Sequence, residues 1–422
     1  MSHFKWDHYS DQPEVIRDRA FKKTIYKQTR WASFKLVIIN IIVYPVSFLL
    51  YLLLPAKKSS ANSQGFFGMG INLDKNPQET KALIDELRVE NLLIRVPLSD
   101  IKNVQAYIEF AEQFSDKNIL INILQDRQHI EDLDLLYQSL DKVFQQFSHL
   151  TTRFQIGNAI NRKKWAFFSM DEYLHFYKVA FELKKQKYPA LTLLGPPIID
   201  FEYYFTIRAL FNLHKIYFDE CSSLLYVDRR GAPENTQMGL DLSKKLYFLQ
   251  MLLRLSPKTS NDIVITETNW PISDTAPYAP TGEKECVSLD DHASFLVRYY
   301  LLALASGVVK NVYWHQLVAP GYGLIDNRNG KLFKYPAFYA FKTMLLLLAS
   351  VEFVSLKVSG KLYQLSFKSL SKPEMIEVYW ALEPCSIKTN NRQVILQDGS
   401  IQDATETIQI GAAPVYLLTK HF

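Results

Sequence analysis

Two apolar runs of this chain end at residues whose types suit catalysis. Residues 263–268 contain Glu267 near their end, just before a polar and aromatic stretch. Earlier in the chain, residues 154–158 end in Asn158, and Ala159 follows. A carboxylate at such a place can act as a covalent nucleophile, and a second carboxylate opposite it can act as general acid and base. Glu267 provides the first carboxylate, whereas Ala159 stands where the second would be expected.

Side chains so distant in sequence meet only if parallel strands bring their ends to one rim. Between residues 66 and 350, strand-like runs alternate with helical patterns; the runs are 66–71, 92–97, 119–124, 154–159, 191–196, 218–226, 263–268 and 308–315. This alternation predicts an α/β fold, a (β/α)8 TIM barrel over residues 66–350. An open doubly wound sheet is the alternative, but no glycine-rich phosphate loop follows the first run.

The last part of the chain has a different pattern. From residue 351 to residue 422, short strand-like runs are separated by turn residues such as Asp398 and Gly399. Runs of this length and spacing predict a small antiparallel, β-sandwich-like domain. Its expected role is to cover part of the barrel surface.

Most of the net charge of +5 lies at the N-terminus. Residues 1–35 hold eight Lys and Arg against four Asp and Glu, a charge of +4, which leaves about +1 for the rest of the chain. A body so close to neutral has no basic face for nucleic acid, so we expect no nucleic-acid partner.

Residues 36–56 contain no charged residue and are mostly aliphatic or aromatic. About 20 apolar residues span a bilayer as a helix, so this segment predicts a transmembrane anchor, with a buried core helix as the alternative. The positive-inside rule places the basic residues 1–35 in the cytoplasm. The polar residues 57–65 form a linker. We therefore expect a single-pass protein of the bacterial inner membrane, with the barrel facing the periplasm.

The sequence predicts neither a metal site nor a cofactor. The three cysteines, Cys221, Cys286 and Cys385, are an odd number and lack the spacing of zinc ligands. They also provide no disulfide framework.

Five side chains at successive predicted strand ends together resemble the site of the clan A glycoside hydrolases. They are Arg95, Asn158, Tyr226, Glu267 and Trp314. The resemblance spans roughly residues 66–418, because the C-terminal region is similar to the accessory β-domain of family 39. In that clan the fourth strand ends in Asn-Glu and the seventh ends in the nucleophilic Glu. The chain departs from the pattern at Ala159 and at Leu225, where a histidine is usual.

The resemblance implies a role for each matched residue. Glu267 would be the nucleophile, and Arg95 would hydrogen-bond it and favour its ionised form. Asn158 would hold the sugar 2-hydroxyl, and Tyr226 would touch the nucleophile. Trp314 would form the floor of the sugar pocket. Trp270, close behind Glu267, is a further expected substrate-binding residue.

The residue Ala159, at the degenerate acid/base position, has three explanations. The first explanation is a substitution made to trap a substrate complex, but the intact N-terminal apolar segment argues against it. Another acid on the rim supplies the proton, the candidates being Asp200, Glu202, Asp228 and Glu234. In the third explanation, the cleft binds sugar without hydrolysing it.

We therefore expect a membrane-anchored glycosidase or transglycosidase that acts on envelope or surface polysaccharide by a retaining mechanism, with an altered or absent general acid. Its partners would be an oligosaccharide or polysaccharide and, through residues 36–56, a lipid bilayer. The alternative is a non-catalytic carbohydrate-binding or polysaccharide-assembly factor. A second carboxyl about 5 Å from Glu267 would favour the enzyme.

Overall fold

The predicted barrel is present in the computed structural model, which describes residues 4–58, 62–228, 231–371, 374–403 and 405–419. Its strands are β3 (Phe67–Ile71), β4 (Asn91–Pro97), β5 (Asn118–Leu124), β6 (Arg153–Ile156), β7 (Thr192–Leu194), β9 (Cys221–Leu224), β10 (Ile263–Thr268) and β11 (Val309–Trp314). They pair in parallel in the order β7-β6-β5-β4-β3-β11-β10-β9, and β8 (Ile198–Ile199) adds to β9. A bridge between Leu194 and Glu220 joins β7 to the segment before β9 and closes the curl. The (β/α)8 prediction is confirmed.

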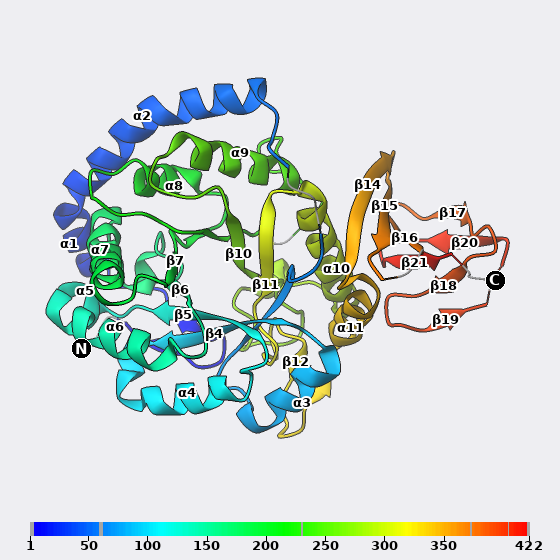
Figure 1. Ribbon diagram of the computed structural model, residues 1–422, viewed down its shortest axis with the longest axis horizontal. Helices are drawn as coiled ribbons and strands as arrows, with labels where there is room; N and C mark the ends of the chain where they lie inside the picture. Colours follow the sequence, from blue (N-terminus) through cyan, green and yellow to red (C-terminus); the bar gives the residue numbers. More distant parts are fainter. Residues whose placement is uncertain (1–3, 59–61, 229–230, 372–373, 404, 420–422) are drawn as a thin grey trace.

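Helices surround this sheet (Figure 1). They are α3 (Pro77–Leu87), α4 (Val104–Glu112), α5 (Arg127–Glu131), α6 (Leu133–Phe147), α7 (Met170–Lys187), α8 (Tyr203–Leu210), α9 (Leu242–Leu255), α10 (Leu289–Ser306) and α11 (Pro336–Leu348). Local sequence explains where several begin. The side chains of Ser169, Asp241 and Ser288 accept backbone N–H groups at the starts of α7, α9 and α10. Proline occupies the first turn of α3 and α11.

The barrel interior is layered, as strand alternation requires. One layer is apolar and consists of Leu93, Leu120, Leu194, Val264 and Tyr313. Two residues further along the strands of Leu93, Leu120 and Val264, the side chains are polar; they are Arg95, Asn122 and Thr266. The polar layer lies at the C-terminal rim, and the apolar layer beneath it supports the site.

The C-terminal region is an antiparallel β-domain, as expected. Its strands are β14 (Val351–Ser359), β15 (Leu362–Ser369), β16 (Met375–Ala381), β17 (Cys385–Lys388), β18 (Gln393–Ile395), β19 (Ile401–Gln402), β20 (Thr407–Ile410) and β21 (Val415–Leu418). A six-stranded sheet, in the order β14-β15-β16-β21-β18-β19, lies beside the β17–β20 pair. The side chains of Trp380 and Tyr416 belong to the main barrel core, so this domain covers the barrel rather than standing apart.

The apolar N-terminal segment forms α2 (Arg30–Leu53), preceded by α1 (Arg19–Gln28). Among the described residues, α2 is the one helix long and apolar enough to span a membrane. It lies along α8 and α9 (Figure 1). Asn40 donates to the Tyr204 carbonyl at 2.9 Å, and Lys35 pairs with Asp171 at 2.8 Å. The rings of Tyr44 and Phe48 lie 5.4 and 5.6 Å from that of Phe248.

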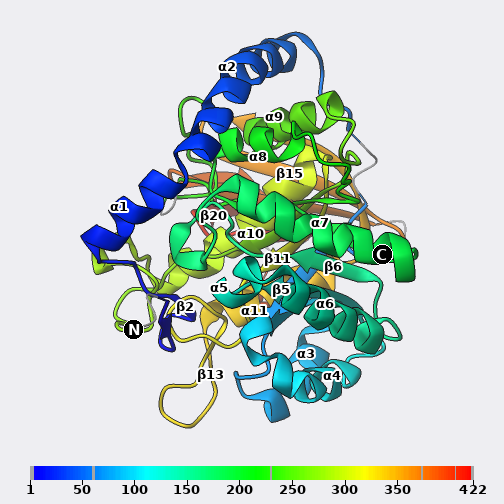
Figure 2. The ribbon, with the colours of Figure 1, turned by 90° about the vertical axis from the view of Figure 1, so that its left-hand side faces the viewer.

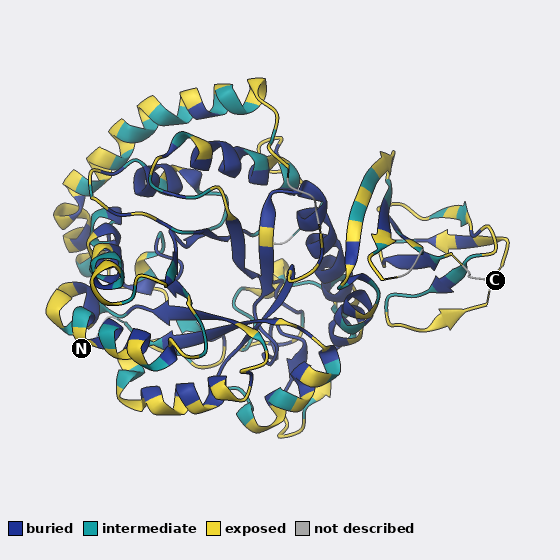
Figure 3. Cartoon of the chain, in the orientation of Figure 1, coloured by how far each residue is buried: buried dark blue, intermediate teal, exposed yellow. Residues whose placement is uncertain are grey.

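The opposite face of α2 is exposed (Figure 3), and many of its exposed residues are apolar. Its exposed residues include Val37, Ile38, Ile41, Ile42, Val46, Leu49, Leu52 and Leu53. The helix therefore has two distinct faces, one against the barrel and one without a partner in the described chain.

The described part of the basic segment also contacts the barrel. Figure 2 shows α1 running from α2 toward a small hairpin made of β1 (Trp6–Asp7) and β2 (Gln12–Pro13). This hairpin lies over the C-terminal rim of the barrel, where Gln12 donates to the Pro280 carbonyl at 3.1 Å. Residues 4–35 pack on the barrel by specific contacts that the sequence pattern does not reveal.

Candidate active site

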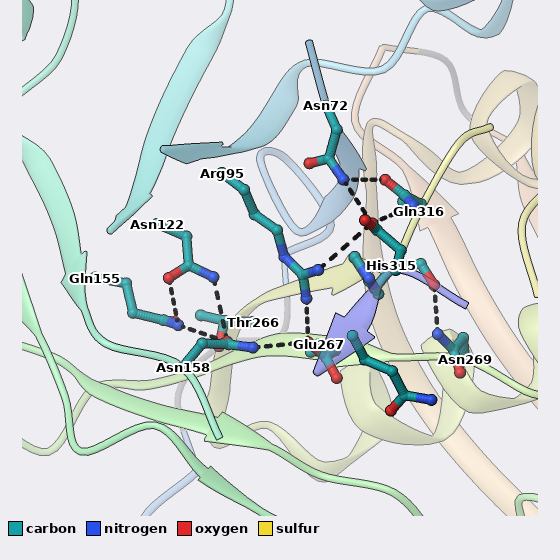
Figure 4. A network of polar contacts seen from close by, with 12 residues as sticks. Asn72, Arg95, Asn122, Gln155, Asn158, Thr266, Glu267, Asn269, His315 and Gln316 are labelled. Atoms are coloured by element: carbon teal, nitrogen blue, oxygen red, sulfur yellow. Dashed lines mark hydrogen bonds and ion pairs between the residues drawn. The ribbon is translucent and has the colours of Figure 1, made fainter. Parts of the chain in front are cut away.

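Glu267 lies at the end of β10 and is the centre of the polar rim. Its Oε2 accepts from Arg95 Nη2 at 2.7 Å and from Asn158 Nδ2 at 3.4 Å, and its Oε1 accepts from the Tyr226 hydroxyl at 2.9 Å. These donors come from the ends of β4, β6 and β9. Figure 4 shows Arg95 and Asn158 pointing at Glu267 from two sides. The structure therefore brings together four of the six side chains that the sequence assigned to the site.

The donors around Glu267 suit an ionised carboxylate, since charge-assisted hydrogen bonds are the strong ones. Burial, and then the neighbouring Glu267, raise the pKa of Tyr226 well above its usual value, so its hydroxyl keeps its proton and donates. Glu267 is itself only 8% exposed. A buried carboxylate held by a cation and two neutral donors is positioned to attack an adjacent electrophilic carbon.

Asn158 is held by the polar layer below it. Its backbone N–H donates to Gln125 Oε1 at 2.8 Å, and its side-chain oxygen accepts from Asn122 and Gln155, both at 3.2 Å. Figure 4 shows this chain of amides leading to Glu267. The amide orientation is thereby set so that Nδ2 faces the carboxylate, an arrangement that keeps the site geometry rigid.

The acid/base position is built differently. Ala159 is buried and packs in an apolar cluster with Leu124, Trp165 and Leu224. Its φ of 44° lies in the left-handed region, which is unfavourable for residues other than glycine. The place of the second carboxylate is thus filled by packing rather than left as a polar gap.

The acids proposed as substitutes are already engaged. Arg162 pairs with Asp200 at 2.5 Å and with Glu202 at 2.7 Å, so one guanidinium holds both carboxylates. Asp228 accepts from the Gly231 N–H at 2.6 Å and from Asn235 at 2.9 Å. Residues 229–230 of this loop lie outside the described residues. Of the acids engaged in this way, only Asp200 lines the cavity at Glu267.

Glu234 does not lie on the rim, contrary to expectation. It is buried between the barrel and the β-domain, where it accepts from Arg298 Nε at 2.8 Å and from Trp380 Nε1 at 2.7 Å. A buried, fully paired carboxylate of this kind joins two structural units, and only tertiary packing creates it.

The two expected tryptophans also lie elsewhere. Trp270 and Trp314 stack on each other with ring centroids 5.8 Å apart, are almost fully buried, and do not line the cavity at Glu267. Strand alternation gives the reason, because Tyr313 points into the barrel and Trp314 therefore points out, against His292. The next residue, His315, returns to the cavity. Trp314 supports the site from behind instead of forming its floor.

A cavity of about 220 Å³ opens beside Glu267. Several of its lining residues were not foreseen: Ser10, Asp11, Gln12, Lys164, Trp165, Asn269, His315 and Tyr322. Burial lowers the pKa of Lys164, and its Nζ donates to Gln12 Oε1 at 2.5 Å. Burial, followed by the charge of Arg95, lowers the pKa of His315 well below its usual value, so His315 is neutral. Asn269 and His315 directly follow two strands, a signal the sequence did offer.

The hairpin contributes one buried carboxylate to this cavity. Asp11 Oδ2 accepts from Asn72 at 3.2 Å and from Gln316 at 3.0 Å, and it lies 3.8 Å from Arg95 Nη1. Figure 4 shows Asn72, Arg95 and Gln316 pointing toward one another from three strand ends. Arg95 thus lies between Asp11 and Glu267. No pattern in the sequence marks Asp11, because its position depends wholly on how the N-terminal segment docks.

Across the part of the chain that is described, no group of three or more His, Cys, Asp or Glu is arranged to hold a metal ion. The centre of this rim consists of the Glu267 carboxylate and the hydrogen-bond donors around it.

No protein-family model and no curated protein matches the chain. Solved structures are similar in fold. A family 39 glycoside hydrolase from Bacteroides cellulosilyticus WH2 superposes with a TM-score of 0.64 at 14% identity, covering 85% of this chain and 81% of that one. A GH39 β-xylosidase from Caulobacter crescentus gives 0.60 at 11% identity, with 86% and 98% covered. A GH30 endoxylanase from Clostridium papyrosolvens C71 gives 0.59 at 9% identity, with 87% and 98% covered. The chain has a glycosidase-like fold.

Proposed function

We propose that this protein is a retaining glycosidase, or a transglycosidase, that acts on a cell-envelope or surface polysaccharide with Glu267 as nucleophile. The observation that carries the proposal is the triple support of the Glu267 carboxylate by Arg95, Tyr226 and Asn158. In a retaining mechanism such a carboxylate attacks the anomeric carbon and displaces the leaving oxygen, and water then hydrolyses the glycosyl ester.

The proposed reaction is limited by protonation of the leaving group. The side chain of Ala159 has no acidic proton to donate, and Asp200 and Glu202 form ion pairs with Arg162. Loss of a general acid costs about 10²- to 10⁴-fold. Substrates whose leaving group departs as a stable anion avoid most of this cost, so they are the substrates on which activity is measurable first.

The test uses dinitrophenyl β-xyloside and β-glucoside, sugars chosen because the similar structures include a β-xylosidase and a glucosidase. A 2-fluoro analogue of each should label Glu267 covalently, detected by mass spectrometry of the peptide. The unmodified substrates should give a burst of dinitrophenol and then slow turnover. Azide should speed the second phase and yield a glycosyl azide of retained configuration.

Glu267→Gln is the matched control for this test, since it keeps the size and hydrogen bonding of the side chain but removes the nucleophile. It should lose both the label and the burst. Absence of any label on Glu267 across a broad panel of aryl glycosides would contradict the proposal.

The second candidate function is a non-catalytic carbohydrate-binding or assembly factor. The apolar packing of Ala159 favours it, because that side of the cleft is built for shape rather than for proton transfer. This candidate predicts sugar binding that survives Glu267→Gln without any covalent intermediate, measurable by calorimetry with unlabelled oligosaccharides.

We further propose that the protein associates with a membrane through the exposed apolar face of α2. The contacts of α1, α2 and the hairpin with the barrel support placing the N-terminus and the barrel in one compartment, in contrast to the expected single-pass arrangement. Reporters that work only outside the cytoplasm, fused before residue 1 or after Phe422, should then behave alike. Opposite behaviour of the two fusions would restore the single-pass arrangement.

A further inference from the structure

The N-terminal hairpin divides the mouth of the barrel into two spaces. One is the cavity of about 220 Å³ at Glu267, and the other is a cavity of about 540 Å³ lined by Phe4 and by hairpin residues such as Trp6. Asp11, Arg95 and Trp165 line both cavities. The hairpin and the residues it touches therefore form a wall across what would otherwise be one longer groove.

This wall is tied to the barrel on several sides. Gln12 bonds the Pro280 carbonyl in the loop after β10 and also Lys164 in the loop after β6. The Trp6 ring meets Trp165 edge to face at 5.8 Å, and Tyr9 meets Tyr278 in the same way at 5.3 Å. Asp11 reaches the ends of the first and last barrel strands through Asn72 and Gln316. Contacts that bridge the mouth in this way suit a fixed part of the site.

The wall leaves room for a ligand beside the nucleophile. Pockets for drug-sized ligands measure about 300–1,000 Å³, so a cavity of about 220 Å³ suits one sugar residue rather than several. The hairpin lies beside this space and not in it. The Asp11 carboxylate on the wall lines this space and can accept hydrogen bonds.

The position of the wall sets the direction of the substrate. The hairpin borders the cavity from the ends of the first and last strands across to Lys164 and Pro280, whereas Ile199 and Asp200 line the side that follows β8. Ile199 packs against the cluster that contains Ala159, the position from which a leaving group would be protonated. A leaving group that departs toward Ile199 and Asp200 would extend away from the hairpin, and the terminal sugar would then meet the hairpin.

We propose that the hairpin of residues 6–13 makes this site specific for chain ends, with Asp11 as the specificity-determining residue that holds hydroxyls of the terminal non-reducing sugar. The proposal rests on the proposed function and deepens it, since it defines the substrate class as the free end of a glycan chain rather than its interior.

The test replaces residues 6–13 by a glycine-serine segment of the same length in the full chain. The probes are a dinitrophenyl monosaccharide and a dinitrophenyl hexasaccharide of the sugar that labels Glu267 fastest, because the proposed site lacks a general acid for unactivated linkages. Wild type should release dinitrophenol from the monosaccharide but hardly from the hexasaccharide, whose further sugars would meet the hairpin. The hairpin variant should release it from the hexasaccharide at least about tenfold faster than wild type, because the two cavities then join into a groove.

Two results would overturn the proposal. One is an unchanged rate of dinitrophenol release from the hexasaccharide in the hairpin variant. The other is faster turnover of small aryl glycosides by that variant, which would mean that the hairpin blocks the site instead of shaping it.

A binding measurement keeps the proposal testable if Glu267 is never labelled and the proposed function fails. In native gels containing xylan or soluble β-glucan, the hairpin variant of Glu267→Gln should be retarded and Glu267→Gln alone should not. Equal mobility of the two proteins in every polysaccharide would contradict the proposal that the hairpin blocks a longer groove. Melting temperatures check that both proteins are folded.

Asp11→Asn tests the specificity role directly. It should raise KM for the aryl glycoside about tenfold, as expected for loss of a contact with the bound substrate. Asp7→Asn is the matched control, because Asp7 bonds only Tyr9 N and Ser10 Oγ within the hairpin. Unchanged KM in Asp11→Asn, or an equal change in Asp7→Asn, would contradict the assignment.

Discussion

The ends of β10 and β6 occupy matching places on the rim, yet they are built in opposite ways. At the end of β10, Glu267 is surrounded by donors from three other strands. At the end of β6, Ala159 faces an apolar cluster that includes Trp165. On that side, the Asp200 carboxylate is paired with Arg162. The end of β10 therefore holds a hydrogen-bonded carboxylate, whereas the end of β6 is packed with apolar side chains.

Under the proposed retaining mechanism, this difference means that the two halves of a double-displacement site can separate. Support for a nucleophile depends on buried donors, which also stabilise the barrel rim, so Arg95 and Asn158 serve the fold even if chemistry weakens. A general acid needs a carboxyl that is free to gain and lose a proton, and such a group contributes little to packing. The acid side can therefore be lost while the nucleophile side stays intact.

The largest effect should come from the nucleophile itself. Glu267→Gln should lower kcat for dinitrophenyl glycosides by roughly 10⁴-fold or more, since removing a nucleophile eliminates the covalent route. Asp200→Asn, on the other side of the comparison, should change the same kcat by less than about threefold. Steady-state kinetics of both variants measure this contrast, and equal losses would mean that the two sides are not separated.

A carboxylate introduced at position 159 should act as a general acid only if the apolar packing around that position is also reduced. Ala159→Glu alone places a carboxylate in an apolar cluster at a left-handed φ, so we expect a lower melting temperature and little gain. Ala159→Glu with Trp165→Ala should raise cleavage of alkyl glycosides by about 10²-fold, the lower range for a general acid. Trp165→Ala alone is the control. A full gain from Ala159→Glu alone would show that the packing is no obstacle.

A smaller loss should follow from trimming one donor on the nucleophile side. Tyr226→Phe removes a hydrogen bond to a charged oxygen, which is worth about 1.5–3 kcal/mol, so kcat should fall about 10- to 10²-fold. Tyr107→Phe removes a similar bond to Asp100, outside the Glu267 cavity, and should leave kcat unchanged. Pre-steady-state dinitrophenol release compares the two variants. An unaffected burst in Tyr226→Phe would remove the tyrosine from the site.

The smallest effect concerns stability rather than rate. Burial lowers the pKa of His292, behind Trp314, to about 4. The unfolded chain binds this proton near pH 6.5, so the unfolded state gains protons first as pH falls, and the free energy of unfolding decreases from about pH 6.5 to 4. The loss reaches at most about 3 kcal/mol. Thermal melts of wild type and His292→Gln across this range should converge at low pH. Parallel curves would contradict the assignment.

The fold was largely predictable from the sequence because its signals are local. The apolar runs that became β3 to β11 each carry enough buried aliphatic residues to be recognised, and capping residues such as Ser169 and Asp241 mark helix starts. Within the site, Arg95, Asn158, Tyr226 and Glu267 lie at strand ends, where a parallel barrel must bring them together. Their meeting follows from strand order alone.

The remaining features depended on tertiary structure. Whether Trp314 or His315 faces the cavity depends on strand alternation relative to Tyr313, which a one-residue shift would reverse. Glu234 resembles a rim acid in sequence, but it is buried only because the β-domain docks over it. Asp11 belongs to the site only because the hairpin crosses the mouth. The sequence by itself determined the barrel and the place of Glu267 at a strand end, since those follow from periodicity and strand order. Only the tertiary structure decided the walls of the cleft, because they are built from contacts between distant segments whose side chains carry no local signal.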